Sequence, residues 1–126
     1  MSFLDKIFGK SEGEDSSVNF WKYIESETDL DNAIAESSDR KVAIFKHSTR
    51  CHISKMVLRN FEKEVSDCGD DVSYYFLDLI EHRNISNKIE SMLGVVHQSP
   101  QLIVLQNGKA VKNASHQSIS TALLKN

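Results

Sequence analysis

A cysteine lies where a strand-like run of the sequence gives way to a helical pattern. The stretch is FKHSTRCHIS, from Phe45 to Ser54, and the cysteine is Cys51. A side chain at a helix start lies near unpaired backbone N–H groups and the positive end of the helix dipole, and both favour an anion. The flanking Arg50 and His52 add positive charge. We therefore predict that Cys51 is an accessible thiol that forms the thiolate, the species that attacks disulfides.

Ser54 follows Cys51 by one helical turn, at the position where a dithiol oxidoreductase has its second cysteine. A hydroxyl can hydrogen-bond a thiolate, but it cannot form a disulfide with it. The other cysteine, Cys68, follows about seventeen residues later, which is roughly 25 Å along one helix. A disulfide needs Cα atoms within about 7 Å of each other. The remaining chemistry is monothiol: Cys51 accepts a group and an external thiol removes it, while Cys68 is assigned packing or no role.

The elements that position Cys51 alternate between strands and helices. The pattern predicts a strand or loop over 18–24, a helix over 28–37, a strand over 41–45, a helix over 51–67, a strand over 72–79, a helix over 84–93, a hairpin over 101–113 and a helix over 118–124. Helices between strands favour parallel pairing, and the hairpin adds an antiparallel edge. We expect an α/β fold in which helices cover both faces of one small mixed sheet.

The spacing of apolar residues predicts which side of each helix faces the core. The expected inward residues are Leu30, Ala33 and Ile34 in the first helix, Ile53, Val57, Phe61 and Val65 in the second, and Ile85, Ile89, Met92 and Leu93 in the third. Trp21 and Tyr23 are also expected to reach the core. Candidate helix caps are Thr28 and either Asn84 or Ser86 at N-terminal ends, and Gly69 and Gly94 at C-terminal ends. The dipeptide Asn107-Gly108 favours the positive φ of a tight hairpin turn.

Length and composition indicate one domain without a nucleic-acid or membrane partner. The chain has 126 residues, of which 40% are hydrophobic, enough for one core. The net charge of −3 offers no basic surface for nucleic acid. No apolar run approaches the ~20 residues of a membrane span. We assign 1–17 to an N-terminal arm and linker and 18–126 to the domain. The arm lacks a secretory signal pattern, so the expected location is the cytoplasm.

The histidines and cysteines do not predict a metal site. His47, Cys51 and His52 lie close in sequence, but no second pair of ligands follows at the spacing of a zinc site. Surface or loop roles are expected for the isolated histidines, His82, His97 and His116. We expect no tightly bound cofactor.

From Lys41 to the C-terminus, about two-thirds of the chain, the order of features resembles the thioredoxin fold. These features are a strand, a Cys-x-x-Ser helix start, a strand–helix pair and the segment SPQLIVLQNGK, which contains the single proline, Pro100. A proline is tolerated as the first residue of a strand, so its position alone indicates no site. The resemblance implies a thioredoxin-like three-layer sandwich. It also implies that Pro100 is cis and faces Cys51, with the backbone of Ser99 pairing with bound substrate.

The residues around Cys51 are similar to the active site of monothiol bacilliredoxins of the YtxJ-like type, which have Thr-Cys-Pro-Ile-Ser after Phe-Lys-His-Ser. The matching residues are Phe45, Lys46, His47, Ser48, Cys51, Ile53 and Ser54. The resemblance implies a monothiol disulfide reductase that removes bacillithiol, or another low-molecular-weight thiol, from mixed disulfides on proteins. That small thiol would be the co-substrate, and a second small thiol or a reductase would recycle the enzyme.

The expected catalytic residues are Cys51 and Ser54, and the expected substrate-binding residues are Arg50, His52, Ser99 and Pro100. Two positions depart from the family pattern. His52 replaces the usual proline after the cysteine, and Phe45 lies where thioredoxins commonly bury an acidic residue. Without that acid, protons would come from solvent, from His47 or His52, or from the incoming thiol.

Two other functions are compatible with a thioredoxin-like fold. A non-catalytic binding or adaptor module would have a cysteine of ordinary reactivity at position 51. An iron–sulfur carrier like the monothiol glutaredoxins usually has Cys-Gly-Phe-Ser, which differs from the Cys-His-Ile-Ser sequence at Cys51. Purified protein with a brown colour would favour the carrier.

Overall fold

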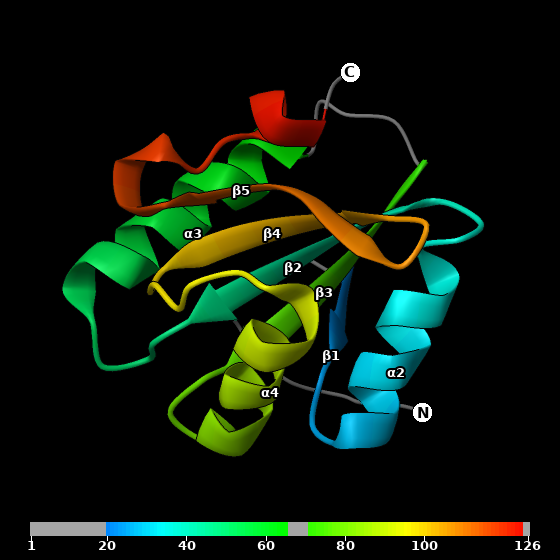
Figure 1. Ribbon diagram of the computed structural model, residues 1–126. Coiled ribbons are helices and arrows are strands. Elements are labelled where there is room, and N and C mark those ends of the chain that lie inside the picture. Colours follow the sequence, from blue (N-terminus) through cyan, green and yellow to red (C-terminus); the bar gives the residue numbers. More distant parts are fainter. Residues whose placement is uncertain (1–19, 66–70, 125–126) are drawn as a thin grey trace, which may run out of the picture.

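The computed structural model describes residues 20–65 and 71–124, and within them the strands form one mixed sheet (Figure 1). The strands are β1 (Trp21–Tyr23), β2 (Lys41–His47), β3 (Val72–Asp78), β4 (Gln101–Gln106) and β5 (Lys109–Ser115). Their spatial order is β1-β3-β2-β4-β5. The predicted arm over 1–17, Cys68 and Gly69 lie outside the described residues. No helix within the described residues is long and apolar enough to span a membrane.

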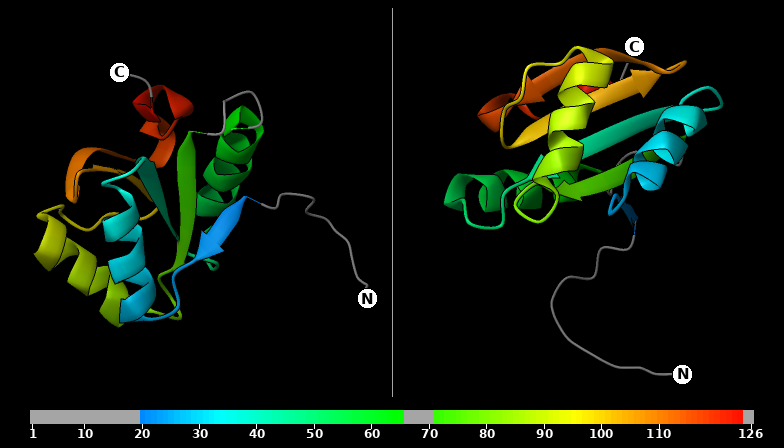
Figure 2. Two further views of the ribbon diagram at one scale, coloured as in Figure 1. Left: turned by 90° about the vertical axis from the view of Figure 1, so that its right-hand side faces the viewer. Right: turned by 60° about the horizontal axis from the view of Figure 1, so that its bottom comes forward.

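Helices cover both faces of this sheet, as the sequence predicted. The helices are α2 (Glu27–Glu36), α3 (His52–Val65) and α4 (Arg83–Leu93). Figure 2 shows α3 on one side of the sheet and α2 and α4 on the other. Successive side chains of a strand point to opposite faces, so Phe45 packs into the α3 layer and Ile44 into the α2 and α4 layer. The protein is therefore a three-layer α/β sandwich.

The direction of β4 differs from the sequence-based expectation. β2 pairs in parallel with β3, but β4 runs antiparallel to β2, with Gln101 opposite Lys46. α4 and the connector 94–100 therefore return the chain to the edge where β2 ends, and they do not form the crossover expected between parallel strands. As a consequence, the start of β4 lies beside the end of β2, so Pro100 is close to the strand that leads to Cys51.

The helix ends show which candidate caps are used. Ser26 caps α2, because its hydroxyl accepts the N–H of Asp29 (3.2 Å), so the prediction of Thr28 was wrong. His82 precedes α4 without a side-chain cap, so the predicted Asn84 and Ser86 caps were also wrong. Gly94 ends α4 with a φ of 69°, as predicted.

The inward face of α3 is rotated from the predicted one at its first turn. Val57, Phe61 and Val65 are buried as expected, but Ile53 is 45% exposed and Ser54 is fully buried. With 3.6 residues per turn, positions three and four before Val57 both lie near its face, and here the position three before it, Ser54, is the buried one. Met92 in α4 and Tyr23 in β1 are likewise exposed, contrary to prediction.

The last segments confirm the hairpin and correct the C-terminal helix. Asn107 and Gly108 have φ values of 54° and 78°, as the dipeptide predicted. The tail forms two 3-10 turns, η2 (His116–Ser118) and η3 (Thr121–Leu124), in place of the predicted helix over 118–124. It still buries Ile119 and Leu124 against the α3 layer. Packing at isolated positions replaces the continuous stripe that an α-helix would need.

Candidate thiol site

Cys51 lies between the end of β2 and the start of α3. Its N–H donates to the carbonyl of Ser48 (3.1 Å), and its own carbonyl accepts the N–H of Lys55 (3.1 Å). That second bond is the first of the helix, so Cys51 occupies the N-cap position of α3. Cys51 is a free thiol and is partly exposed. The sulfur is thus carried at the N-terminal end of a long helix, where an anion is favoured.

The Ser54 hydroxyl is buried below this turn and joins α3 to β2. It accepts the backbone N–H of Ser48 (3.2 Å) and shares a hydrogen bond with Nδ1 of His47 (2.8 Å). These contacts place it against the end of β2. A hydrogen bond from this hydroxyl to the Cys51 sulfur stays a prediction.

His47 is the last residue of β2 and is buried beside two aromatic rings. Its ring centroid lies 5.4 Å from that of Phe76 and 6.4 Å from that of Phe45. Burial lowers the pKa of His47, the charge of Asp78 opposes that effect, and the charge of Lys55 adds to it. Sequence reasoning named His47 as one of several proton sources and as part of the family pattern, but it indicated no contact with Ser54. Its contact with Ser54 singles it out.

The other predicted residues lie around Cys51 in different settings. Arg50 and His52 are both exposed. The Ser99–Pro100 peptide bond is cis, Pro100 is buried, and the Ser99 hydroxyl oxygen is buried with no hydrogen-bond partner among the described residues. The antiparallel β4 brings Ser99–Pro100 to the sheet edge where β2 ends. Phe45, two residues before His47 in β2, is fully buried.

A second polar cluster holds the connector 94–100 from the opposite face of the sheet. Lys46 is fully buried, and its Nζ donates to Nδ1 of His97 (2.7 Å). Nδ1 also contacts the hydroxyl of the buried Ser86 (3.2 Å). Burial lowers the pKa of Lys46 to about 8, against the opposing effect of the Glu90 charge. His97 therefore has a buried partner, which its isolated place in the sequence did not indicate.

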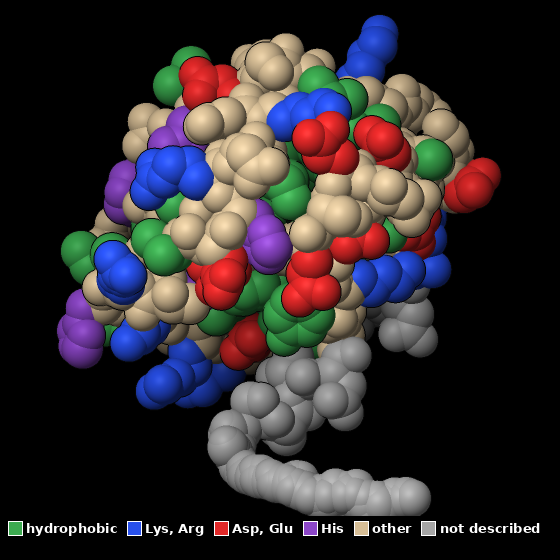
Figure 3. Space-filling view, turned by 90° about the horizontal axis from the view of Figure 1, so that it is seen from below, with side chains coloured by type: hydrophobic (Ala, Val, Ile, Leu, Met, Phe, Trp, Pro, Cys, Tyr) green, Lys and Arg blue, Asp and Glu red, His purple; other side chains and the backbone are tan. Residues whose placement is uncertain are grey.

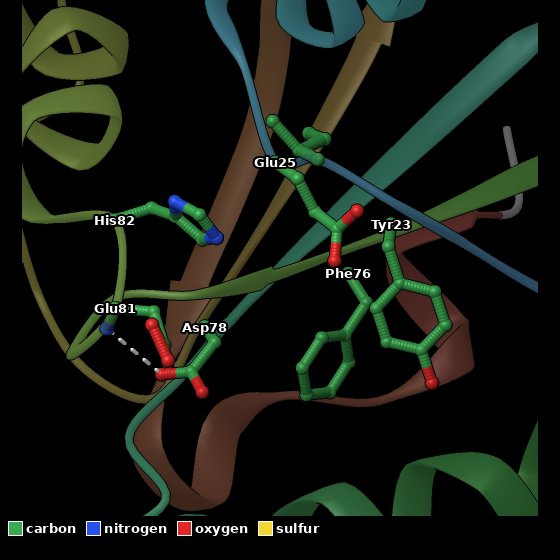
Figure 4. A pocket seen from close by; sticks show the side chains of 7 residues that line it. Tyr23, Glu25, Phe76, Asp78, Glu81 and His82 are labelled. Atoms are coloured by element: carbon green, nitrogen blue, oxygen red, sulfur yellow. Dashed lines mark hydrogen bonds between the residues drawn. The ribbon is translucent and has the colours of Figure 1, made fainter.

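A cleft of about 420 Å³ lies at the ends of β1 and β3 (Figure 4). Its lining residues are Tyr23, Ile24, Glu25, Phe76, Asp78, Glu81 and His82. Asp78 pairs in register with His47, so the cleft borders the edge that carries Cys51. Figure 3 shows acidic, histidine and hydrophobic side chains next to one another on the lower face of the molecule. Among the described residues, no group of three His, Cys, Asp or Glu side chains could hold a metal ion.

Comparison with solved structures identifies the fold. The chain is similar to a putative oxidoreductase with a thioredoxin fold, with a TM-score of 0.73 and 28% identity over 83% of this chain and 90% of that one. It is also similar to thioredoxin NaTrxh from Nicotiana alata, with a TM-score of 0.70 and 17% identity over 90% and 94% of the two chains. Malassezia sympodialis thioredoxin matches with a TM-score of 0.66 and 24% identity over 84% and 85%. The fold is that of thioredoxin.

The family is identified by residues 22–124, which match the sequence model described as monothiol bacilliredoxin BrxC. The chain belongs to the monothiol bacilliredoxin family. Together with the thioredoxin fold, this membership makes it a thiol oxidoreductase.

Proposed function

We propose that the protein removes a low-molecular-weight thiol, with bacillithiol as the expected one, from mixed disulfides on other proteins. The proposal rests on one observation above all: Cys51, a partly exposed free thiol, occupies the N-cap position of a helix whose first turn has Ser54 in place of a second cysteine. Family membership supports the same chemistry. The reaction would run in the cytoplasm, where thiols are kept reduced.

The reaction has two exchange steps. The Cys51 thiolate attacks the small-thiol sulfur of the mixed disulfide and forms a new S–S bond with it. The electron pair of the broken bond leaves with the target cysteine, which takes a proton and is released as a thiol. A second small thiol, as its thiolate, or a partner reductase then attacks the sulfur held on Cys51. The thiolate of Cys51 is restored. Because Ser54 has no sulfur, it cannot form an intramolecular disulfide with Cys51.

The surrounding residues supply binding in this scheme. The exposed guanidinium of Arg50 would attract a small thiol that carries carboxylates, and the exposed ring of His52 could donate a hydrogen bond to it. The backbone of Ser99 would pair with the extended segment of the target protein that flanks its cysteine. This role suits Ser99–Pro100 because the connector ends beside the strand that leads to Cys51.

A mass experiment tests the proposal. A Cys68→Ala variant, in which only Cys51 can react, is mixed with a model protein that carries a bacillithiol mixed disulfide. Intact masses of both proteins should show the small thiol moving onto Cys51, and the matched Cys51→Ser variant should take up none. Mixed disulfides with glutathione and coenzyme A measure the specificity. A folded Cys68→Ala protein that removes no small thiol from any of the three would overturn the proposal and favour an adaptor.

A further inference from the structure

Buried polar groups connect the end of α3 that carries Cys51 to His47. Ser54 and His47 are both buried, and their polar atoms are 2.8 Å apart. The N–H of Ser48 also reaches the Ser54 oxygen, at 3.2 Å. Buried polar groups are rarely left unpaired, so these bonds define how the hydroxyl is used.

The Ser54 hydroxyl can serve two opposite states of a neighbouring thiol. It has one proton to donate and two lone pairs that accept. The Ser48 N–H takes one lone pair. When Nδ1 of His47 has no proton, the hydroxyl donates to it and can still accept an S–H. When Nδ1 carries a proton, the ring donates to the hydroxyl, whose own proton is then available for a thiolate. Protonation of Nδ1 therefore switches Ser54 from an acceptor to a donor.

Cys51 occupies the position from which it can use that switch. The side chain of an N-cap residue can reach the third residue of its helix, as the serine or threonine of a capping box does. In α3 the N-cap is Cys51 and the third residue is Ser54. The sulfur and the hydroxyl thus belong to the same helix end.

The surroundings of His47 suit a transient proton acceptor. Burial holds the ring neutral by lowering its pKa, and Lys55 of α3 acts in the same direction. Asp78, the partner of His47 in β3, favours the charged ring and limits the cost of protonation. Phe45, which precedes His47 by two residues on the same side of β2, is fully buried and cannot take a proton.

We propose that His47 is a positioning residue that receives the Cys51 proton through Ser54, an inference that rests on the proposed function. The proton of the Cys51 thiol passes to the Ser54 oxygen while the Ser54 proton passes to Nδ1 of His47. The products are the Cys51 thiolate, held by the Ser54 hydroxyl, and an imidazolium. This step is a proton transfer and involves no oxidation or reduction. The later exchange consumes the thiolate, and the ring returns its proton to solvent.

The test compares alkylation of Cys51 by iodoacetamide across a range of pH in Cys68→Ala protein and its variants. Ser54→Ala removes the hydroxyl that links Cys51 to His47. His47→Asn replaces the ring with an amide, which can hydrogen-bond at the place of Nδ1 but cannot be protonated. Each should slow alkylation at neutral pH by about tenfold or more. The double variant should be no slower than either single one. Ser54→Thr, which keeps the hydroxyl, should recover most of the rate.

Ser86→Ala is the matched control, because Ser86 is also a buried helix serine bonded to Nδ1 of a histidine, on the opposite face. It should alkylate like the parent. Folded Ser54→Ala and His47→Asn variants with the parent pH profile would overturn the inference. If His47→Asn does not fold, the Ser54→Ala and Ser54→Thr pair decides. Uptake of bacillithiol by the parent protein is measured separately. The proposed function can therefore fail while the pH effect on alkylation is present, and the pH effect can be absent while uptake is observed.

Discussion

Two histidine–serine pairs lie on opposite faces of the sheet. One of two neighbouring residues of β2 contacts the first pair, and the other belongs to the second. Lys46 contacts His97, which is also bonded to Ser86 of α4. His47, the next residue, contacts Ser54 of α3. The two faces are reached because adjacent side chains of a strand point in opposite directions.

The difference between the pairs lies in what each one is attached to. On the α4 side, the buried Lys46 is hydrogen-bonded to His97. This bond holds the connector 94–100, which ends with Ser99–Pro100. On the α3 side, the pair lies one helical turn from Cys51 and includes no lysine. The same side-chain types therefore hold a backbone segment on one face and, in our proposal, take the proton of Cys51 on the other. Substitutions on each face should separate these two tasks.

The largest effect is expected from Cys51→Ser, which removes the group that the α3-side pair serves. Uptake of a small thiol from a mixed disulfide should be abolished, because a serine hydroxyl does not exchange with disulfides. Intact mass measures the uptake. Ser86→Ala on the other face should retain it, and loss of uptake in Ser86→Ala would contradict the division between the faces.

Ser54→Cys should convert the reaction from monothiol to dithiol. A thiol one turn after Cys51 has the spacing of Cys-x-x-Cys motifs, so it can attack the mixed disulfide on Cys51 and form an internal disulfide. Intact mass should then show an oxidised protein two hydrogens lighter, with no retained small thiol. Ser86→Cys, tested in parallel, should still accumulate the mixed disulfide.

Lys46→Ala should destabilise the protein by about 2–4 kcal/mol, because it removes a fully buried side chain and leaves His97 without its donor. Urea unfolding measures the loss. Lys46→Met keeps the volume without burying a charge, so it should be close to wild type or more stable. Equal loss in both variants would show that the hydrogen bond, and not packing, accounts for the effect.

The pH dependence of stability should identify Lys46. Burial lowers its pKa from 10.5 to about 8, so between these values the unfolded chain binds more protons than the folded one. The contribution of Lys46 to the free energy of unfolding is therefore complete above pH 10.5. It decreases as the pH falls and is lost below about 8. The free energy of unfolding should rise by about 3 kcal/mol across this window. Lys46→Met should lack that rise, and a rise of the same size in both proteins would assign it to other groups.

The smallest effect is expected from Ser86→Ala, which removes one hydrogen bond to His97 and should cost about 1 kcal/mol. Thermal unfolding measures it. Alkylation of Cys51 should not change, since Ser86 lies on the opposite face. A change in alkylation with no change in stability would mean that the two faces are coupled through β2.

Local preferences explain what could be read from the sequence. Cys51 precedes a helix because an apolar strand, a polar bend and a 3.6-residue stripe follow one another in the chain. Gly94 and Asn107-Gly108 were identifiable because positive φ excludes most other residues. The arrangement of helices on both faces of one sheet follows from the alternation of these elements. Each of these features depends on neighbours within a few positions.

The tertiary structure decided the direction of β4, the inward position of Ser54 and the partners of Lys46 and His97. Lys46 and His97 are 51 residues apart, and no periodic pattern marks a polar pair that is buried. The return of the chain after α4 depends on packing along the sheet, which local propensity does not specify. The sequence by itself therefore determined most of the elements and the place of Cys51 before a helix. Only the fold could select which polar groups lie at that end of the helix, because their hydrogen bonds form between different elements of the structure.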